Sequence, residues 1–363
     1  MPLSKIQGIE GQVTPNLGRR NLVHNGAMQV DQRNNNASFT VVNGNDITGY
    51  IADRFRVNEN SSSVMTGQTV SDAPVGFEYS SKLTVTTADA SLASTEFHRL
   101  IQGIEGKDIG HLNWGSANAK TLTLSFYVKS SVAGQYYVSV FNNSANRTLL
   151  KGYTISSANT WEKKTITIIG DQSGTWLTTN APGIYLMWSL GTGSSYQSNT
   201  LDAYQAGFFM AKSDQVNLAA TNGSTFQLTG VQLEVGSAAT DFEHRSYGEE
   251  LLVCKRYFEV YSPTAADEGA IAVVRTRTNV NGYNAIVNYH EKRAQPSCAI
   301  DYDRMHKPGV VKDTLSNITI TISSGETQSC QVNATPANDS TISTHGYLGK
   351  SSGTGRLTLS AEL

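Results

Sequence analysis

Pairs of acidic residues are the first candidates for chemistry, because two carboxylates on either side of a glycosidic bond can hydrolyse it. Glu105 with Asp108 and Glu249 with Glu250 are the pairs in this sequence. The second pair lies in the first turn of a predicted helix, where the helix dipole favours negative charge. The first pair lies in a glycine-rich turn at 103–110, where turn-forming or solvent-exposed carboxylates are the simpler interpretation. Neither pair therefore predicts a catalytic site.

Other catalytic and metal-binding patterns are missing from the sequence. It has no H-E-x-x-H zinc motif, no phosphate-binding loop and no dinucleotide-binding glycine motif. The seven histidines never fall within four residues of one another. Cys254, Cys298 and Cys330 are too far apart for a C-x-x-C pair, and we expect them to be small buried side chains. We predict that the protein is not an enzyme and has no catalytic residue, no metal and no cofactor.

Aromatic residues beside hydrogen-bonding side chains give a better lead, because sugars stack on Tyr and Trp while Asn, Asp and Gln bind their hydroxyls. Trp114, Trp176 and Tyr196 lie in predicted loops, where covering the core is a simpler interpretation than stacking. In the C-terminal part, three tyrosines and a histidine lie among several Asn and Asp residues. A role in ligand binding and a role in core packing are equally open for these four residues. These candidate receptor-binding residues are Tyr283, Tyr289, Tyr302 and His306.

The composition limits the class of protein that has to position these residues. Charged residues make up only 16% of the 363 residues and the net charge is -2, so we expect no nucleic-acid partner. Abundant Gly, Ser, Thr and Asn, with sixteen Tyr and only eight Pro, favour strands, turns and polar surfaces. No run of about 18 apolar residues occurs, and the sequence starts without a secretory signal, so we expect cytoplasmic synthesis and no membrane insertion.

Short runs with alternating apolar residues predict antiparallel strands that bury one face. The clearest is 121–129, where Leu122, Leu124, Phe126 and Val128 share the face that we expect to be core. The same pattern predicts strands at 135–141, 161–169, 183–190, 226–235, 315–322 and 356–363. In the run 226–235 the apolar phase slips at Gly230, which predicts a β-bulge. The predicted fold class is therefore all-β, an antiparallel β-sandwich followed by a smaller β domain.

One helix interrupts the strand pattern, between Ser246 and Phe258. Ser246 and Glu249 have capping-box spacing, which marks the start of the helix. The apolar stripe of this helix needs a partner, and we expect three copies to bury it around a trimer axis. The stripe consists of Tyr247, Leu251, Cys254 and Phe258.

The predicted domain organisation follows from these patterns. Residues 1–20 are too poor in apolar groups to form a core and are expected to be an arm that becomes ordered on a partner. Residues 21–245 form the β-sandwich, 246–262 the connector helix, and 263–363 the smaller C-terminal β domain.

Several stretches together resemble bacteriophage tail-fibre and other virion proteins. NLVHNGAMQV at 21–30, followed by ADRF at 52–55, is similar to the opening of these proteins. The region 102–129 resembles their jelly roll, which is like a carbohydrate-binding module, and 225–236 with 242–250 is similar to the segment that closes that domain.

The resemblance implies a receptor-binding subunit of the virion, made in the host bacterial cytoplasm and commonly a homotrimer. Residues 1–20 would bind another tail or baseplate protein, and the C-terminal domain would be the tip that binds a glycan or protein of the host surface. Two alternatives remain open: a tail-associated glycan hydrolase, and a structural capsid or tail decoration protein without a receptor. The lack of a β-helix repeat and of a convincing acid pair argues against the hydrolase.

Overall fold

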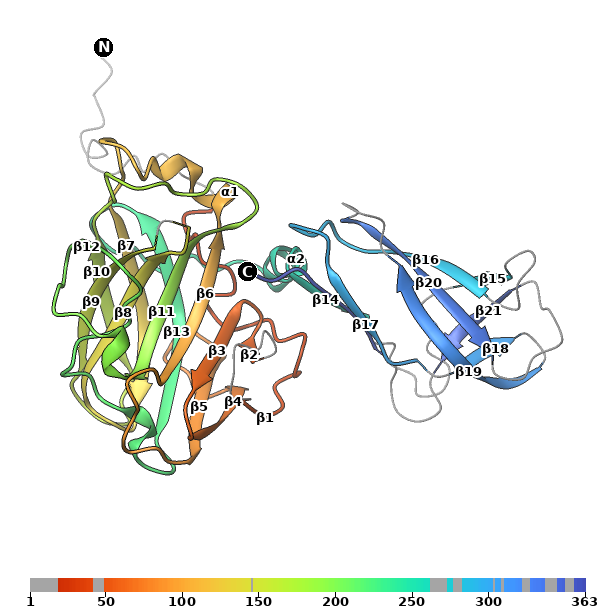
Figure 1. Cartoon of the computed structure of the whole chain (residues 1–363), viewed down its shortest axis with the longest axis horizontal. Coiled ribbons are helices and arrows are strands. Elements are labelled where there is room, and N and C mark those ends of the chain that lie inside the picture. Colours follow the sequence, from red (N-terminus) through yellow and green to blue (C-terminus); the bar gives the residue numbers. More distant parts are fainter. Residues whose placement is uncertain are drawn as a thin grey trace, which may run out of the picture.

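The structure, a computed structural model, describes residues 19–41, 49–144, 146–261, 273–276, 283–302, 304–307, 310–321, 327–336, 345–349 and 356–363. Its sheets are antiparallel, which confirms the all-β fold class (Figure 1). The predicted arm at 1–20 lies almost wholly outside the described residues. None of the helices in the described part is both long and apolar enough to cross a bilayer.

Two sheets lie face to face and form the sandwich (Figure 1). The first sheet has the order β1 (Phe39–Thr40), β4 (Val64–Val70), β5 (Ser80–Thr87), β13 (Thr225–Val235), β7 (Leu122–Ser130), β10 (Glu162–Ile168). The second has the order β12 (Tyr204–Ala206), β9 (Arg147–Ile155), β8 (Gly134–Asn142), β11 (Pro182–Thr192), β6 (Phe97–Glu105), β3 (Phe55–Asn60), β2 (Tyr50–Ala52). Short helical turns connect them: α1 (Gly106–Ile109), η1 (Gly110–Leu112), η2 (Ser194–Tyr196) and η3 (Leu218–Ala220).

Apolar side chains at alternating strand positions fill the space between the two sheets. The predicted core face of β7 is fully buried, and Phe126 meets Trp188 of β11 edge to face at 5.9 Å. The opposite face of β7 differs from the prediction, because Thr123 and Ser125 are buried as well. The chain that leaves β13 covers this face, and Thr123 Oγ1 donates to the Gly236 carbonyl at 2.8 Å.

The predicted β-bulge at Gly230 is confirmed. The register of β13 against β7 shifts between Thr229 and Gln232, and Gly230 has a φ of +60°. A Cβ atom at this position would lie 2.7 Å from a ring carbon of Phe77 and 2.9 Å from a ring carbon of Tyr127. Both the backbone angle and the close approach therefore require glycine.

The helix α2 (Tyr247–Lys255) begins as predicted, with a complete capping box between Ser246 and Glu249. It ends earlier than predicted, because Phe258 is the first residue of a strand, not the last of the helix. Phe258 gains burial and strand hydrogen bonds there, which outweigh the helical pattern. Two residues of the predicted apolar stripe differ in exposure. Cys254 is fully buried inside the protein, whereas Tyr247 is 57% exposed.

A junction sheet of three strands follows α2: β14 (Phe258–Tyr261), β22 (Leu357–Ser360) and β17 (Ser297–Ile300). In Figure 1, this sheet and α2 lie between the sandwich and a closed barrel. The boundary predicted at residue 263 stays a prediction, although β14 before it pairs with β22 near the end of the sequence. The barrel strands are β15 (Val273–Thr276), β16 (Tyr283–Asn288), β20 (Ser329–Pro336), β19 (Val310–Thr321), β18 (Arg304–Lys307) and β21 (His345–Gly349).

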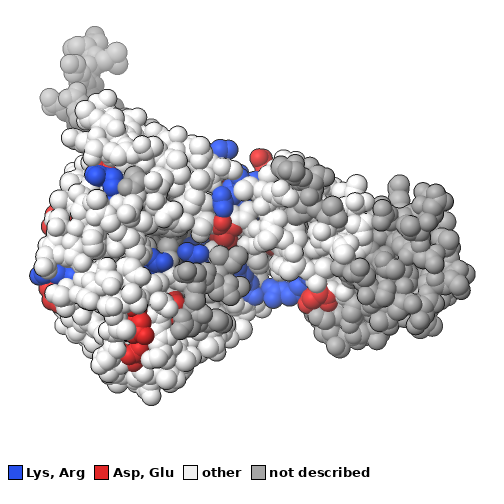
Figure 2. All heavy atoms as spheres, viewed as in Figure 1, with Lys and Arg blue, Asp and Glu red and all other residues white. Residues whose placement is uncertain are grey.

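Buried charges hold the junction sheet in place, and Figure 2 shows basic side chains gathered along this junction. Glu259 of β14 is 1% exposed and accepts hydrogen bonds from Lys292 Nζ and from the His290 ring, both at 2.7 Å. Burial opposes ionisation of Glu259, but these two partners outweigh it and lower its pKa to about 2. The carboxylate is therefore charged and paired at neutral pH.

Gly230→Ala is expected to lower the free energy of unfolding by about 3 kcal/mol, because left-handed strain adds to overpacking against two rings. Gly223→Ala is the matched control, since Gly223 has a φ of +81° with no atom within 4 Å of a Cβ. The control should lose only about 1 kcal/mol, from backbone strain alone. Equal losses in urea denaturation would mean that the ring contacts at the bulge contribute nothing.

The depressed pKa of Glu259 predicts a loss of stability in acid. Its pKa in an unfolded chain is about 4.3, so the stabilisation is complete above that value and is lost as the pH falls toward 2. Glu259→Gln should flatten this part of the curve of unfolding free energy against pH. Glu291→Gln, an exposed neighbour, is the control and should keep the wild-type slope. A Glu259→Gln protein as acid-sensitive as the wild type contradicts the assignment.

Candidate functional site

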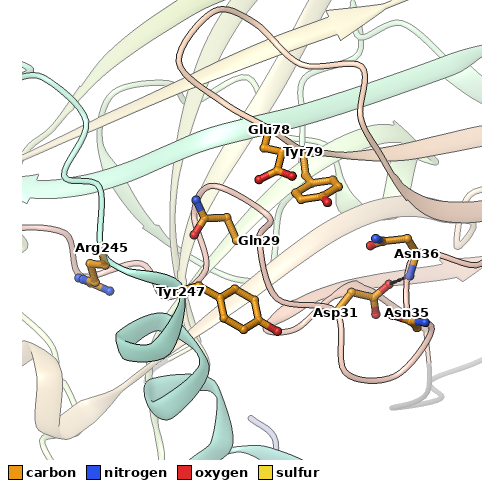
Figure 3. A pocket seen from close by; sticks show the side chains of 8 residues that line it. All are labelled: Gln29, Asp31, Asn35, Asn36, Glu78, Tyr79, Arg245 and Tyr247. Atoms are coloured by element: carbon orange, nitrogen blue, oxygen red, sulfur yellow. Dashed lines mark hydrogen bonds between the residues drawn. The ribbon is translucent and has the colours of Figure 1, made fainter. Parts of the chain in front are cut away.

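A polar cleft of about 450 Å³ lies where three segments far apart in the sequence meet (Figure 3). The turn at 29–36, the end of the β4–β5 loop at 78–79, and the entry to α2 at 245–247 form its walls. The lining side chains are Gln29, Asp31, Asn35, Asn36, Glu78, Tyr79, Arg245 and Tyr247.

The turn that carries Asp31 presents amide groups to the cleft. The Asp31 carboxylate accepts hydrogen bonds from the backbone N–H of Asn34 at 3.0 Å and of Asn36 at 2.8 Å. Asn35 and Asn36 have φ values of +49° and +63°, a left-handed conformation that asparagine tolerates better than most residues. Both amides are exposed. Burial raises the pKa of Asp31, although the turn's own N–H groups oppose that effect.

Two tyrosines supply the apolar surface of the cleft. Tyr79 packs against the sandwich core, and its backbone carbonyl accepts a hydrogen bond from Thr229 Oγ1 at 2.7 Å. Its hydroxyl donates to the Glu78 carboxylate, which raises the pKa of Tyr79. Tyr247 begins α2 with an exposed side chain, and Figure 3 shows its ring directed toward the turn of Asp31. The core therefore anchors one ring, and the other is available to a ligand.

Arg245 lines the cleft but is already engaged in the fold. Its Nη2 atom donates to the Asn21 carbonyl at 2.7 Å and lies 3.3 Å from a Glu243 oxygen. In the described part of the chain, neither Asp31 nor Glu78 forms an ion pair with a basic side chain. The cleft thus offers mainly hydrogen-bond acceptors beside an aromatic face, which suits a ligand with many hydroxyl groups.

Metal binding is not indicated by the described side chains. No group of three or more His, Cys, Asp or Glu residues among them is arranged to hold an ion. The expectation that the protein has no metal and no cofactor stays a prediction.

The four receptor-binding candidates of the C-terminal part do not form a described surface. Tyr289 and Tyr302 are 7% and 6% exposed and belong to a small core with Cys330 and Val332. The side chains of Tyr283 and His306 lie outside the described residues. Burial of Tyr289 and Tyr302 favours packing over stacking on a ligand, so receptor binding by these residues stays an untested prediction.

Of the three aromatic residues predicted in loops, Trp114 and Trp176 cover the sandwich core, whereas Tyr196 packs elsewhere. Trp114 and Trp176 are 8% and 7% exposed and meet edge to face at 4.6 Å, which confirms the packing interpretation. The indole N–H of Trp114 donates to the Lys120 carbonyl at 2.7 Å. Tyr196 packs edge-on against Phe208 at 5.6 Å.

Three of the four acidic residues in the two pairs, Glu105, Glu249 and Glu250, are engaged in structural contacts. Glu105 is buried and accepts two hydrogen bonds from Arg256, at 2.8 and 2.7 Å. Burial opposes ionisation of Glu105, but Arg256 outweighs it and lowers the pKa. Glu249 completes the capping box, and Glu250 accepts the backbone N–H of Asn25 at 2.5 Å.

No pattern in the sequence identifies the cleft. Asp31 followed by three asparagines at 34–36 marks a turn, but nothing in the sequence shows that 78–79 and 245–247 lie beside it. Tyr247 was assigned to the apolar stripe of the helix, whereas it borders the cleft. Only the fold brings these segments together.

No protein-family model and no curated protein matches the chain. Among solved structures, the enzymatically active domain of tailspike protein 4 of bacteriophage CBA120 is 14% identical, with a TM-score of 0.34. That match covers 60% of this chain and 22% of the tailspike chain. The matched region is therefore only about a fifth of the length of the tailspike chain. A protein of Bacteroides thetaiotaomicron that is inferred to bind sugar is 13% identical, covering 60% of this chain and all (100%) of that one, with a TM-score of 0.35.

A carbohydrate-binding module solved with β-1,4-galactotriose is 12% identical, covering 60% of this chain and 99% of that one, with a TM-score of 0.29. At these identities and TM-scores, similarity transfers no ligand, activity or assembly. The strands and their pairing define the class directly: this is an all-β protein built on an antiparallel β-sandwich.

Proposed function

We propose that the chain is a non-catalytic receptor-binding subunit of a bacteriophage virion, and that its polar cleft binds a neutral saccharide of the host surface. The observation that carries this proposal is the cleft itself, where the exposed ring of Tyr247 lies beside carboxylate and amide acceptors. The resemblance of 21–30 with 52–55, of 102–129, and of 225–236 with 242–250 to virion proteins supports the location on a phage particle.

The chemistry of the cleft favours a neutral sugar over an anionic one. Asp31 and Glu78 accept hydrogen bonds from hydroxyl groups and repel a carboxylate or phosphate. A ring stacked on Tyr247 contributes about 1 kcal/mol, and each net hydrogen bond about 1 kcal/mol. A few such contacts give a weak single site, near the millimolar range.

Weak single sites suffice for adsorption when several act together. Linked copies raise the effective concentration of the second and third binding events, so avidity exceeds the affinity of one site. We propose the homotrimer for this reason, with residues 1–20 attached to another tail or baseplate protein. The structural use of Glu105, Glu249 and Glu250 supports a non-catalytic role over the glycan hydrolase, because each pair then lacks a second free carboxylate.

The test of the cleft is binding of the full chain to an array of neutral and acidic bacterial polysaccharides, followed by titration of the best neutral oligosaccharide. Tyr247→Ala should weaken that binding about fivefold, because the stacking surface is lost. Its stability should change by less than about 0.5 kcal/mol, since the side chain is exposed.

Leu252→Ala is the matched control, because Leu252 lies on the same helix, is 55% exposed and does not line the cleft. It should bind the oligosaccharide as the wild type does. Absence of any neutral ligand on the array, or equal weakening by both substitutions, would overturn the cleft as the binding site.

The trimer is tested by light scattering of the purified full chain at micromolar concentration. The expected mass is three times 39.2 kDa. A monomeric mass for a folded protein would contradict the trimer, and with it the explanation of adsorption by avidity.

A further inference from the structure

The outer face of the second sheet carries two arginines on neighbouring strands. Strand register places Arg56 of β3 opposite Ile101 of β6, and Asn58 opposite Arg99. Ile101 in turn pairs with Met187 of β11, so these residues share one face. The face points away from the sandwich core.

Arg99 is a desolvated cation that has no charged partner among the described residues. Its Nε and Nη2 atoms donate to Asn58 Oδ1 at 3.1 and 2.8 Å, whereas Nη1 meets only the sulfur of Met187, at 3.1 Å, and more distantly that of Met210. Thioether sulfur is a weak acceptor. Burial, together with the charge of Arg56, lowers the pKa of Arg99 to about 10. Such a charge is costly unless an anion compensates it.

The surroundings of Arg99 are basic and aromatic. Within the described part of the chain neither Arg99 nor Arg56 belongs to an ion pair, and both contribute positive charge around the half-buried Tyr185. The ring of Phe208 lies 5.0 Å from the Arg99 guanidinium. Figure 2 shows basic side chains toward the middle of the sandwich surface as well as at the junction.

The carboxylate of Asp214, close to this face, already has other partners. Asp214 accepts a hydrogen bond from the Tyr137 hydroxyl at 2.6 Å and forms an ion pair with Lys212 at 3.3 Å. It therefore does not neutralise the two arginines.

We propose that this face binds an anionic saccharide, whose acidic group pairs with Arg99 and Arg56 while its ring lies against Tyr185 or Phe208. Guanidinium groups bind carboxylates and phosphates through strong charge-assisted hydrogen bonds, and aromatic rings supply the apolar surface that a sugar needs. The site is separate from the polar cleft, which lies among other segments and presents acceptors. One site thus suits an acidic sugar and the other a neutral sugar.

The probe is a trimer of galacturonic acid, compared with the same trimer after full methyl esterification, by calorimetric titration of the full chain. The acid should bind at least tenfold more tightly than the ester, and its affinity should fall as salt is raised. Arg99→Met and Arg56→Gln should each weaken binding of the acid about tenfold. Lys163→Gln, which removes an exposed charge from the first sheet, is the control and should leave binding unchanged.

Thermal unfolding separates binding from structure. Arg99→Met should unfold at no lower temperature than the wild type, because it removes a buried charge without an acidic partner. If that variant fails to fold, the binding result for Arg56→Gln decides, since Arg56 is only half-buried and forms no ion pair with any residue that the structure describes.

Three results would overturn the proposal. Equal affinity for acid and ester would show that charge does not contribute to binding. Equal binding by Arg56→Gln and the wild type would show that the arginine pair is not the site. Equally tight binding of inorganic phosphate alone would show a simple anion site, not a saccharide site. Binding of the neutral sugar by Tyr247→Ala tests only the cleft. The proposal for the cleft and the proposal for the arginine face can therefore be refuted independently of each other.

Discussion

The buried guanidinium of Arg54 is compensated by the carboxylate of Glu362, which lies 308 residues later in the sequence. Arg54 and Glu362 side chains are 2% and 3% exposed, and they form an ion pair in which Arg54 also donates to the Gly103 carbonyl at 2.6 Å. Burial disfavours the charge on Arg54, but Glu362 outweighs it and raises the pKa. Removing one member of such a pair costs about 3 to 5 kcal/mol, because the other charge remains buried. This constraint fixes the C-terminal segment against the sandwich.

The junction and the polar cleft follow from that attachment. Strand β22 precedes Glu362 and pairs with both β14 and β17, so the junction sheet is placed with it. β14 follows α2 closely, and Arg256 between them is tied to the second sheet through Glu105. The start of the same helix carries Tyr247 to the cleft. The cleft that we propose as a ligand site thus depends on a charge pair that lies outside its lining.

The two proposed ligand sites differ in the sign of the charges that the fold leaves without an ion-pair partner. Most buried carboxylates near α2 are compensated, as the bonds of Glu105 and Glu259 show. At the cleft, Asp31 and Glu78 lack a basic partner within the described residues, and on the outer face of the second sheet Arg99 lacks an acidic one. Uncompensated groups of opposite sign on separate surfaces are the physical basis for expecting both neutral and acidic sugars as ligands.

The sequence by itself determined the local elements. Alternating apolar residues such as Leu122 to Val128 predicted strands, the phase slip at Gly230 predicted the bulge, and Ser246 with Glu249 predicted the start of α2. These features depend on neighbours a few residues apart, and the sequence displays them directly. The end of α2, the burial of Tyr302 and the assembly of the cleft depend on which distant segments pack together. Only the tertiary structure decided them, because burial and pairing energies come from contacts between residues that the sequence keeps far apart.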